Sequence, residues 1–196
     1  MSTHILIPLK PLAMAKQRLA PVLEPSERRR LMVSMLEHVC RQAVASGVGP
    51  VALATSEPQA PLLARGLGVG VLADGGLAWN DGLRHALDAV HPAPAGVIYL
   101  AADLPLVTAA EIAELAADAP ARGVVIGRAH DGGTNALGLW PATAIHPGFG
   151  APGSAALHAQ AAADAGYPSR MVDLPGVALD VDTPDDVVRA ATAVAG

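Results

Sequence analysis

The chain lacks the features that mark secreted and membrane proteins. It has one cysteine, Cys40, so an internal disulfide and a cysteine-based metal cluster are both excluded. No apolar run reaches the roughly 18 residues of a membrane span. The N-terminus also lacks the basic segment and following apolar segment of a secretory signal. We therefore expect a cytoplasmic protein that does not bind membranes.

Aromatic residues and positive charge are scarce as well. Aromatic residues make up 3% of the chain and hydrophobic residues 52%, so Ala, Val and Leu must fill the core. The net charge of −5 argues against a general nucleic-acid or anionic-membrane binder. A length of 196 residues fits one domain, 1–196, with a sizeable core.

Several well-known catalytic motifs are absent from the sequence. There is no Walker A motif, no HExxH and no GxSxG, and no GxGxxG directly follows a predicted strand as a dinucleotide-binding fingerprint would. The seven histidines show no spacing typical of metal ligands. The chemistry must therefore depend on other residues.

Short apolar runs alternate with helical patterns along the chain. Strands are predicted at 4–9, 51–55, 69–73, 97–101, 124–127 and 136–140. A long helix starts near Ser26 and ends at Gly47, a capping box at 108–111 opens another, and Thr183 with Pro184 opens the last. This alternation predicts a three-layer α/β domain with a mostly parallel sheet.

Three cations lie in the first strand-to-helix connection. Lys10, Lys16 and Arg18 follow the strand at 4–9, within the stretch IPLKPLAMAKQRL. In open α/β sheets this connection lies at the carboxyl ends of the strands, where ligands bind. Cations that converge there suit a polyanion such as a triphosphate, and the alternative is a solvated basic loop.

Carboxylates occur at two further places where a metal site is expected. Asp103 ends the apolar strand at 97–101 and would project into the ligand crevice, where it can hold Mg²⁺. Asp180 and Asp182 alternate along an extended segment and should face the same side, so one of them could complete the site. We favour Asp180, because Asp182 could instead support the helix start at Thr183. Asp103 could likewise have only a structural role, in which its carboxylate accepts hydrogen bonds within the turn after the strand.

Three glycine-containing segments could meet ligands. The turn 131–135 carries Thr134 and Asn135 and is either an anion site or a tight hairpin. The segment 149–154 leads into a helix near Ser154, whose N-terminus could bind phosphate or carboxylate or could simply be capped. Gly76 and Asn80 precede another helix and could approach a base or ribose.

Together these segments resemble the guanylyltransferase family of coenzyme F420 biosynthesis. Its members act on 2-phospho-L-lactate, phosphoenolpyruvate or 3-phospho-D-glycerate. The similarity is carried by IPLKPLAMAKQRL, AADLPL, DGGTNAL, FGAPGS and LDVDTPDD, which span nearly the whole chain in order. The resemblance implies a GT-A-like nucleotidyltransferase fold, GTP and Mg²⁺ as reactants, and a homodimer.

The resemblance also assigns roles to particular residues. Lys16 and Arg18 would bind the GTP phosphates, and Asp103 would bind the metal. Lys10, Gly76 and Asn80 are further GTP-binding candidates from their positions in the sequence alone. Thr134, Gly150 and Ser154 match the family's positions for the phosphorylated acid. The family's form of FGAPGS is one residue shorter, FGPGS, so Ala151 is an insertion here.

Two other functions compete with this interpretation. One is another nucleotidyltransferase of the same fold, acting on a sugar phosphate or on the molybdenum cofactor. Its usual glycine-rich first loop is missing here. The other is a non-catalytic nucleotide-binding module, which would not need the metal carboxylates. The sequence does not distinguish the three acids, because each presents a carboxylate and a phosphate a few atoms apart.

Overall fold

A single twisted sheet forms the centre of the molecule. The computed structural model describes residues 2–117 and 123–195. The sheet has the order β3-β2-β1-β4-β6-β5-β7, and β6 is antiparallel to β4 and β5 while the other pairs are parallel. The strands are β1 (Thr3–Pro8), β2 (Val51–Ala54), β3 (Gly70–Leu72), β4 (Gly96–Leu100), β5 (Gly123–Arg128), β6 (Thr134–Trp140) and β7 (Ser169–Val172). The predicted mostly parallel sheet is confirmed.

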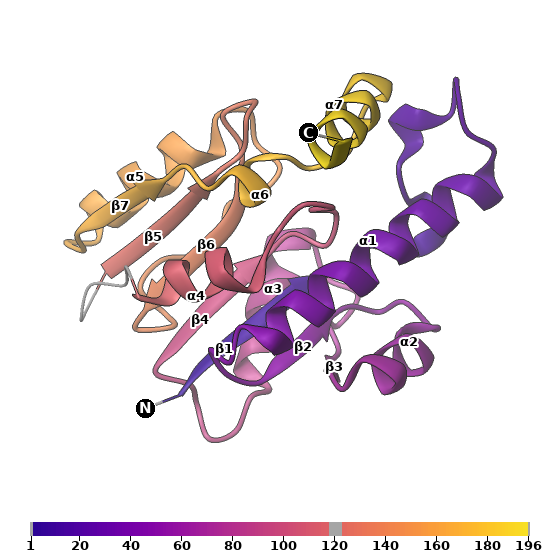
Figure 1. The fold of residues 1–196 in the computed structure, drawn as a ribbon. Helices are drawn as coiled ribbons and strands as arrows, with labels where there is room; N and C mark the ends of the chain where they lie inside the picture. Colours follow the sequence, from indigo (N-terminus) through magenta and orange to yellow (C-terminus); the bar gives the residue numbers. More distant parts are fainter. Residues whose placement is uncertain (1, 118–122, 196) are drawn as a thin grey trace.

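Helices cover both faces of this sheet (Figure 1). One apolar core contains residues of α1, α2 and α4, and a second contains residues of α3 and α5. The helices are α1 (Pro25–Ala45), α2 (Ala60–Leu67), α3 (Trp79–Asp88), α4 (Ala109–Ala117), α5 (Ser154–Asp164), α6 (Pro175–Ala178) and α7 (Pro184–Ala195). The molecule therefore has the three layers predicted from the sequence.

The apolar strands supply both cores because their side chains alternate between the faces. Ile5 and Ile7 of β1 lie in the core under α1, whereas Leu6 lies in the opposite core. In β4, Leu100 and Tyr99 divide in the same way. Burial of both faces explains why these strands are continuous apolar runs in the sequence.

Two short elements, β7 and α6, are absent from the sequence prediction. Each has four residues, which is too few to show a clear periodicity. β7 is an edge strand beside β5, and three of its four residues are exposed. Its position is determined by pairing with a distant strand rather than by its own pattern.

The fold opens a crevice at the carboxyl ends of β1 and β4. These strands are neighbours, but the next strand after β1 is β2 on one side and the next after β4 is β5 on the other. Connections that leave adjacent strands in opposite directions create the usual ligand site of open α/β sheets. Figure 1 shows α7 beyond this end of the sheet, beside the connection that follows β1. Among the described residues, no helix is long and apolar enough to cross a membrane.

Candidate functional site

A cavity of about 400 Å³ lies in this crevice. It is lined by the connection after β1, by the segment after β4, by the start of β6 and by the C-terminal segment before α7. The lining includes Lys10, Lys16, Arg18, Trp79, Asp103, Thr134, Asn135, Phe149, Gly150, Asp180 and Asp182. Most of the predicted site residues are thus brought together around one space.

Lys16 lies at the centre of the charged part of the cavity. Its ammonium donates to Asp103 and, at 2.9 Å, to Asp182, and its side chain is only 4% exposed. Burial lowers the pKa of Lys16, but attraction by Asp103 and Asp182 outweighs burial and raises it overall. Among the described non-glycine residues only Lys16 has a positive φ, of 51°. Such backbone strain persists where surrounding contacts impose it and is common at functional sites.

Asp103, Asp180 and Asp182 form a cluster of carboxylates. Each offers one oxygen atom, and these atoms lie within 4.8 Å of one another. Burial raises the pKa of Asp180, a hydrogen bond of 3.0 Å from Asn135 opposes this shift, and the neighbouring carboxylates reinforce it. A set of carboxylate oxygens fits a hard divalent cation such as Mg²⁺ or Mn²⁺. The structure thus places both Asp180 and Asp182 beside Asp103, whereas the sequence suggested that one of the two would complete the site.

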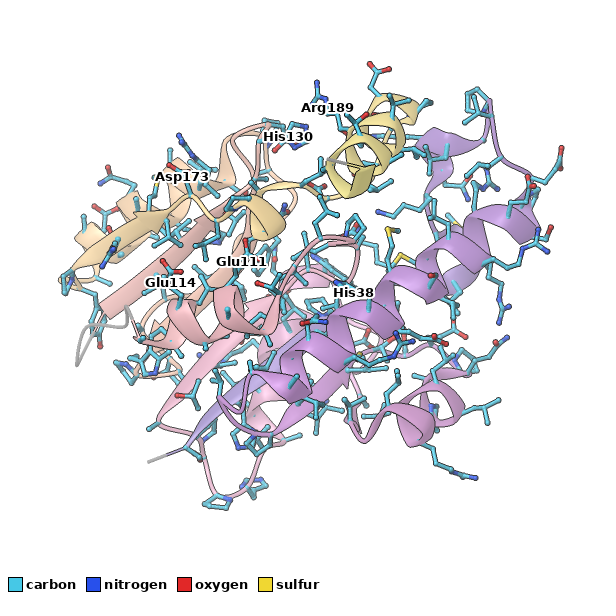
Figure 2. All side chains as sticks on the ribbon, in the orientation of Figure 1. His38, Glu111, Glu114, His130, Asp173 and Arg189 are labelled. Atoms are coloured by element: carbon cyan, nitrogen blue, oxygen red, sulfur yellow. The ribbon has the colours of Figure 1, made fainter. Side chains whose placement is uncertain are left out.

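Asp186 has the structural role that the sequence left open for Asp182. The Asp186 carboxylate accepts hydrogen bonds from the backbone N–H groups of Asp182 and Thr183 and from the Thr183 hydroxyl. Figure 2 shows His130, at the tip of the β5–β6 hairpin, beside Arg189 of α7, and both lie near Asp186. Because Asp186 supports the helix start, the Asp182 carboxylate faces the cavity.

The other two cations of the first connection are more exposed than Lys16. Arg18 has a side chain that is 74% exposed, and its nearest guanidinium nitrogen is 3.6 Å from Asp182. Lys10 lies over the ring of Trp79, with its ammonium 4.7 Å from the ring centre. Both residues line the cavity and remain free to approach an anion.

The connection after β1 is held by the end of β2. The Thr55 hydroxyl donates to the Leu9 carbonyl at 2.6 Å, and the Glu57 carboxylate accepts from the Leu12 N–H at 2.8 Å. Thr55 and Glu57 are both buried. Sequence analysis missed these two residues, because such contacts join segments some 45 residues apart and leave no local pattern.

Neutral groups form the opposite part of the cavity. Thr134 begins β6 and lines the cavity, and its hydroxyl lies 3.2 Å from the Ser154 hydroxyl and 3.0 Å from Nδ1 of His158. All three residues are buried. Asn135 points elsewhere: its side-chain amide donates to the Val177 carbonyl and to Asp180. Adjacent residues of β6 thus serve the two parts of the cavity.

The glycine-rich turn before Thr134 is a tight hairpin. The Ala129 N–H donates to the Gly133 carbonyl, and the Gly133 N–H donates to the Asp131 carboxylate. At the start of α5 the N–H of Ser154 donates to Ala151 and that of Ala155 to Gly132. These backbone groups are therefore already bonded within the hairpin and the helix start.

Three predicted residues do not line the cavity. Ser154 is connected to it through Thr134, whereas Gly76 and Asn80 lie outside its lining. The Asn80 side chain pairs with the backbone of Phe149 in both directions, at 2.9 and 3.2 Å. Asn80 thus fixes the loop that carries Phe149 and Gly150, and its role toward GTP remains a prediction.

His158 is a further residue that the sequence analysis did not single out. It lies four residues after Ser154 on α5, so both face the same side of the helix. That spacing could have indicated a shared site. His158 contacts a hydroxyl, so the spacing of metal ligands does not reveal it.

Known proteins are similar to this chain over nearly its whole length. The chain is 40% identical over 194 residues to the phosphoenolpyruvate guanylyltransferase of Sphaerobacter thermophilus, covering 97% of this chain and 93% of that protein. It is 36% identical over 196 residues to the enzyme of the same name from Rubrobacter xylanophilus, covering 96% and 93%.

Solved structures share the fold. A nucleotidyl transferase from Methanothermobacter superposes with a TM-score of 0.71 at 17% identity, covering 96% of this chain and 95% of that one. Rv0371c from Mycobacterium tuberculosis, in complex with manganese, gives a TM-score of 0.57 at 24% identity, covering 97% and 98%. The family described as "Guanylyl transferase CofC like" matches residues 3–191. The chain therefore belongs to the CofC-like guanylyl transferase family.

Proposed function

We propose that this protein transfers GMP from GTP to a small phosphorylated carboxylic acid and releases diphosphate. The observation that carries the proposal is one cavity with Lys16 and three carboxylates on one side and the Thr134 hydroxyl on the other. Lys16 and the carboxylates suit a nucleoside triphosphate with a divalent cation, and the Thr134 hydroxyl suits a small anion. We take phosphoenolpyruvate as the first acid to test, because relatives carry that name. 2-Phospho-L-lactate and 3-phospho-D-glycerate are the other candidates.

The carboxylate cluster would hold Mg²⁺. Asp103, Asp180 and Asp182 supply only oxygen ligands, the donor type that Mg²⁺ prefers. When bound, the ion neutralises phosphate charge. The Lys16 ammonium is bonded to two of the same carboxylates, so it competes with a cation for them. It would be free to contact GTP phosphates once a cation binds there.

The proposed reaction needs no general base from the protein. A phosphate oxygen of the acid forms a bond to the α-phosphorus of GTP, and the bond from that phosphorus to the bridging oxygen of the β-phosphate breaks. The attacking oxygen is already ionised, so no proton has to be removed. Lys16 and Arg18 would hold the phosphates in line and offset their charge. This explains why the cavity pairs cations with carboxylates and contains no nucleophilic dyad among its lining residues.

The test is diphosphate release by the purified protein with GTP, Mg²⁺ and each acid in turn. We expect stoichiometric diphosphate and a GMP–acid adduct, identified by mass, with at least one of the three acids. ATP, CTP and UTP serve as controls for the base. Release that requires a sugar phosphate instead would favour another nucleotidyltransferase of this fold. Nucleotide binding without release in any mixture would overturn the enzymatic proposal.

Two further proposals concern the location and the oligomeric state of the protein. The sequence leads us to propose the cytoplasm, and the resemblance leads us to propose a homodimer. Sedimentation of the purified protein tests the second proposal, and fractionation of the source cells tests the first.

A further inference from the structure

Both ring nitrogens of buried His158 are engaged. Nε2 lies 2.8 Å from the backbone nitrogen of Gly148, and Nδ1 lies 3.0 Å from the Thr134 hydroxyl oxygen. His158 is 2% exposed. The ring of Phe149 packs edge-on against the His158 ring, and the two ring centres are 5.3 Å apart. Phe149 and Thr134 both line the cavity, so His158 contacts two separate parts of the cavity lining.

The backbone N–H of Gly148 determines which ring nitrogen of His158 carries the hydrogen. The Gly148 N–H can only donate, so Nε2 must be unprotonated and accept. A neutral imidazole then carries its hydrogen on Nδ1, which donates to Thr134. Burial lowers the pKa of His158 to about 4, in agreement with a neutral ring.

This tautomer fixes the role of the Thr134 hydroxyl. Its oxygen has two lone pairs, one of which accepts from His158 and the other from the Ser154 hydroxyl at 3.2 Å. Ser154 is 2% exposed, and among the described residues its hydroxyl has Thr134 as its hydrogen-bond partner, so its hydrogen goes there. The remaining capacity of Thr134 is its own O–H, which can only donate into the cavity.

We propose that His158 is a positioning residue that makes Thr134 an obligatory donor to the anionic group of the acid. The proposal rests on the proposed function for the identity of the ligand. Pre-oriented hydrogen-bond donors strengthen binding because their ordering cost is met during folding. A ligand oxygen with lone pairs, such as a phosphate or carboxylate oxygen, is therefore favoured at Thr134.

The tautomer can be measured without any substrate. In ¹⁵N-labelled protein at pH 7, two-bond ¹⁵N–¹H correlations should show His158 with a protonated Nδ1 and an unprotonated Nε2. A protonated Nε2 would overturn the proposal. Because this measurement needs no turnover, it separates failure of the inference from failure of the proposed function.

Two substitutions separate positioning from simple packing. In His158→Asn the side-chain amide can reach the Nδ1 position and donate to Thr134, whereas in His158→Gln the amide reaches toward Gly148. We expect His158→Gln to raise the KM for phosphoenolpyruvate about tenfold and to leave the KM for GTP within about twofold, whereas His158→Asn keeps most acid affinity. His146→Gln, an exposed change in the connection between β6 and α5, should leave both constants unchanged.

A double mutant completes the test. Thr134→Val removes the hydroxyl that His158 orients, so His158→Gln should add almost nothing to the KM of Thr134→Val. Additive effects of the two changes would mean that His158 acts only through packing and would overturn the proposal. Equal losses in His158→Asn and His158→Gln would do the same. Absence of GMP transfer in the wild-type protein would contradict the proposed function and leave the tautomer result standing.

Discussion

The two sides of the cavity would bind an anion in different ways. On the charged side Lys16 is paired with Asp103 and Asp182, and Arg18 lies near Asp182. On the neutral side Thr134 receives hydrogen bonds from His158 and Ser154. Under the proposed function, the charged side would exchange its internal partners when ligands arrive, whereas the neutral side would present its donor beforehand. Substitutions on the charged side should then act mainly on GTP binding and transfer, and substitutions on the neutral side mainly on affinity for the acid.

Asp103→Asn should have the largest effect on the activity that depends on the charged side. The substitution is nearly isosteric but removes a negative charge from the cluster, so we expect diphosphate release to fall about 10²–10³-fold with little loss of folding. Release is measured with saturating GTP and acid, and circular dichroism checks the fold. Asp185→Asn, at an exposed position in the first turn of α7, is the control and should behave like wild type. Normal turnover by a folded Asp103→Asn protein would contradict the metal assignment.

Lower pH should reduce the free energy of unfolding through protonation of His158 on the neutral side. A histidine in the unfolded chain binds a proton near pH 6.5, whereas folded His158 does so near pH 4, because burial lowers its pKa. The unfolded state therefore binds more protons between these values, and the free energy of unfolding falls as pH falls through that window, by at most about 3 kcal/mol. Urea unfolding at pH 7 and pH 4.5 measures the change. His158→Gln should lack this part of the pH dependence, and identical slopes in both proteins would argue against it.

Lys16→Met should move the affinities of two ligands in opposite directions. Loss of the ammonium removes a charged partner of the triphosphate, so GTP affinity should fall by about 1.5–3 kcal/mol. The same loss removes a competitor for Asp103 and Asp182, so Mn²⁺ affinity, followed by paramagnetic resonance, should rise about tenfold. Arg65→Met, an exposed change on α2, is the control for lost charge. If both affinities fall together, Lys16 supports the carboxylates rather than competing for them.

Ser154→Ala should produce the smallest and most selective change. The hydroxyl donates to Thr134 and does not cap α5, whose N-cap residue is Gly153, so the melting temperature should change little. Loss of one hydrogen bond of about 1 kcal/mol should raise the KM for the acid about fivefold and leave GTP binding near normal. Ser34→Ala, an exposed helical serine, is the matched control. Weaker GTP binding with an unchanged KM for the acid would show that the two sides are assigned in reverse.

The two sides also differ in how well sequence predicts them. The charged side could be predicted because its residues follow buried strands or alternate along an extended segment, as Asp103, Asp180 and Asp182 do. The neutral side depends on contacts between distant segments, such as Thr134 with His158 and Asn80 with Phe149. Such pairs have no fixed spacing, so only the folded chain reveals them.

The fold was predictable for similar reasons. The buried parts of β1 and β4 are continuous apolar runs, and the capping box of Thr108 and Glu111 is present as predicted. β7 and α6 were missed because pairing and packing with remote residues, not local pattern, place them.

The ion pair between Lys16 and Asp182 joins residues 166 positions apart. Ribosomes add about 5–20 residues per second, so Asp182 is synthesised roughly 10–30 s after Lys16. Until then Lys16 lacks one of its two carboxylate partners, and the carboxylate cluster is incomplete. The cavity can therefore be completed only after the C-terminal segment has been synthesised. Truncation near the C-terminus should consequently abolish ligand binding long before it removes the sheet.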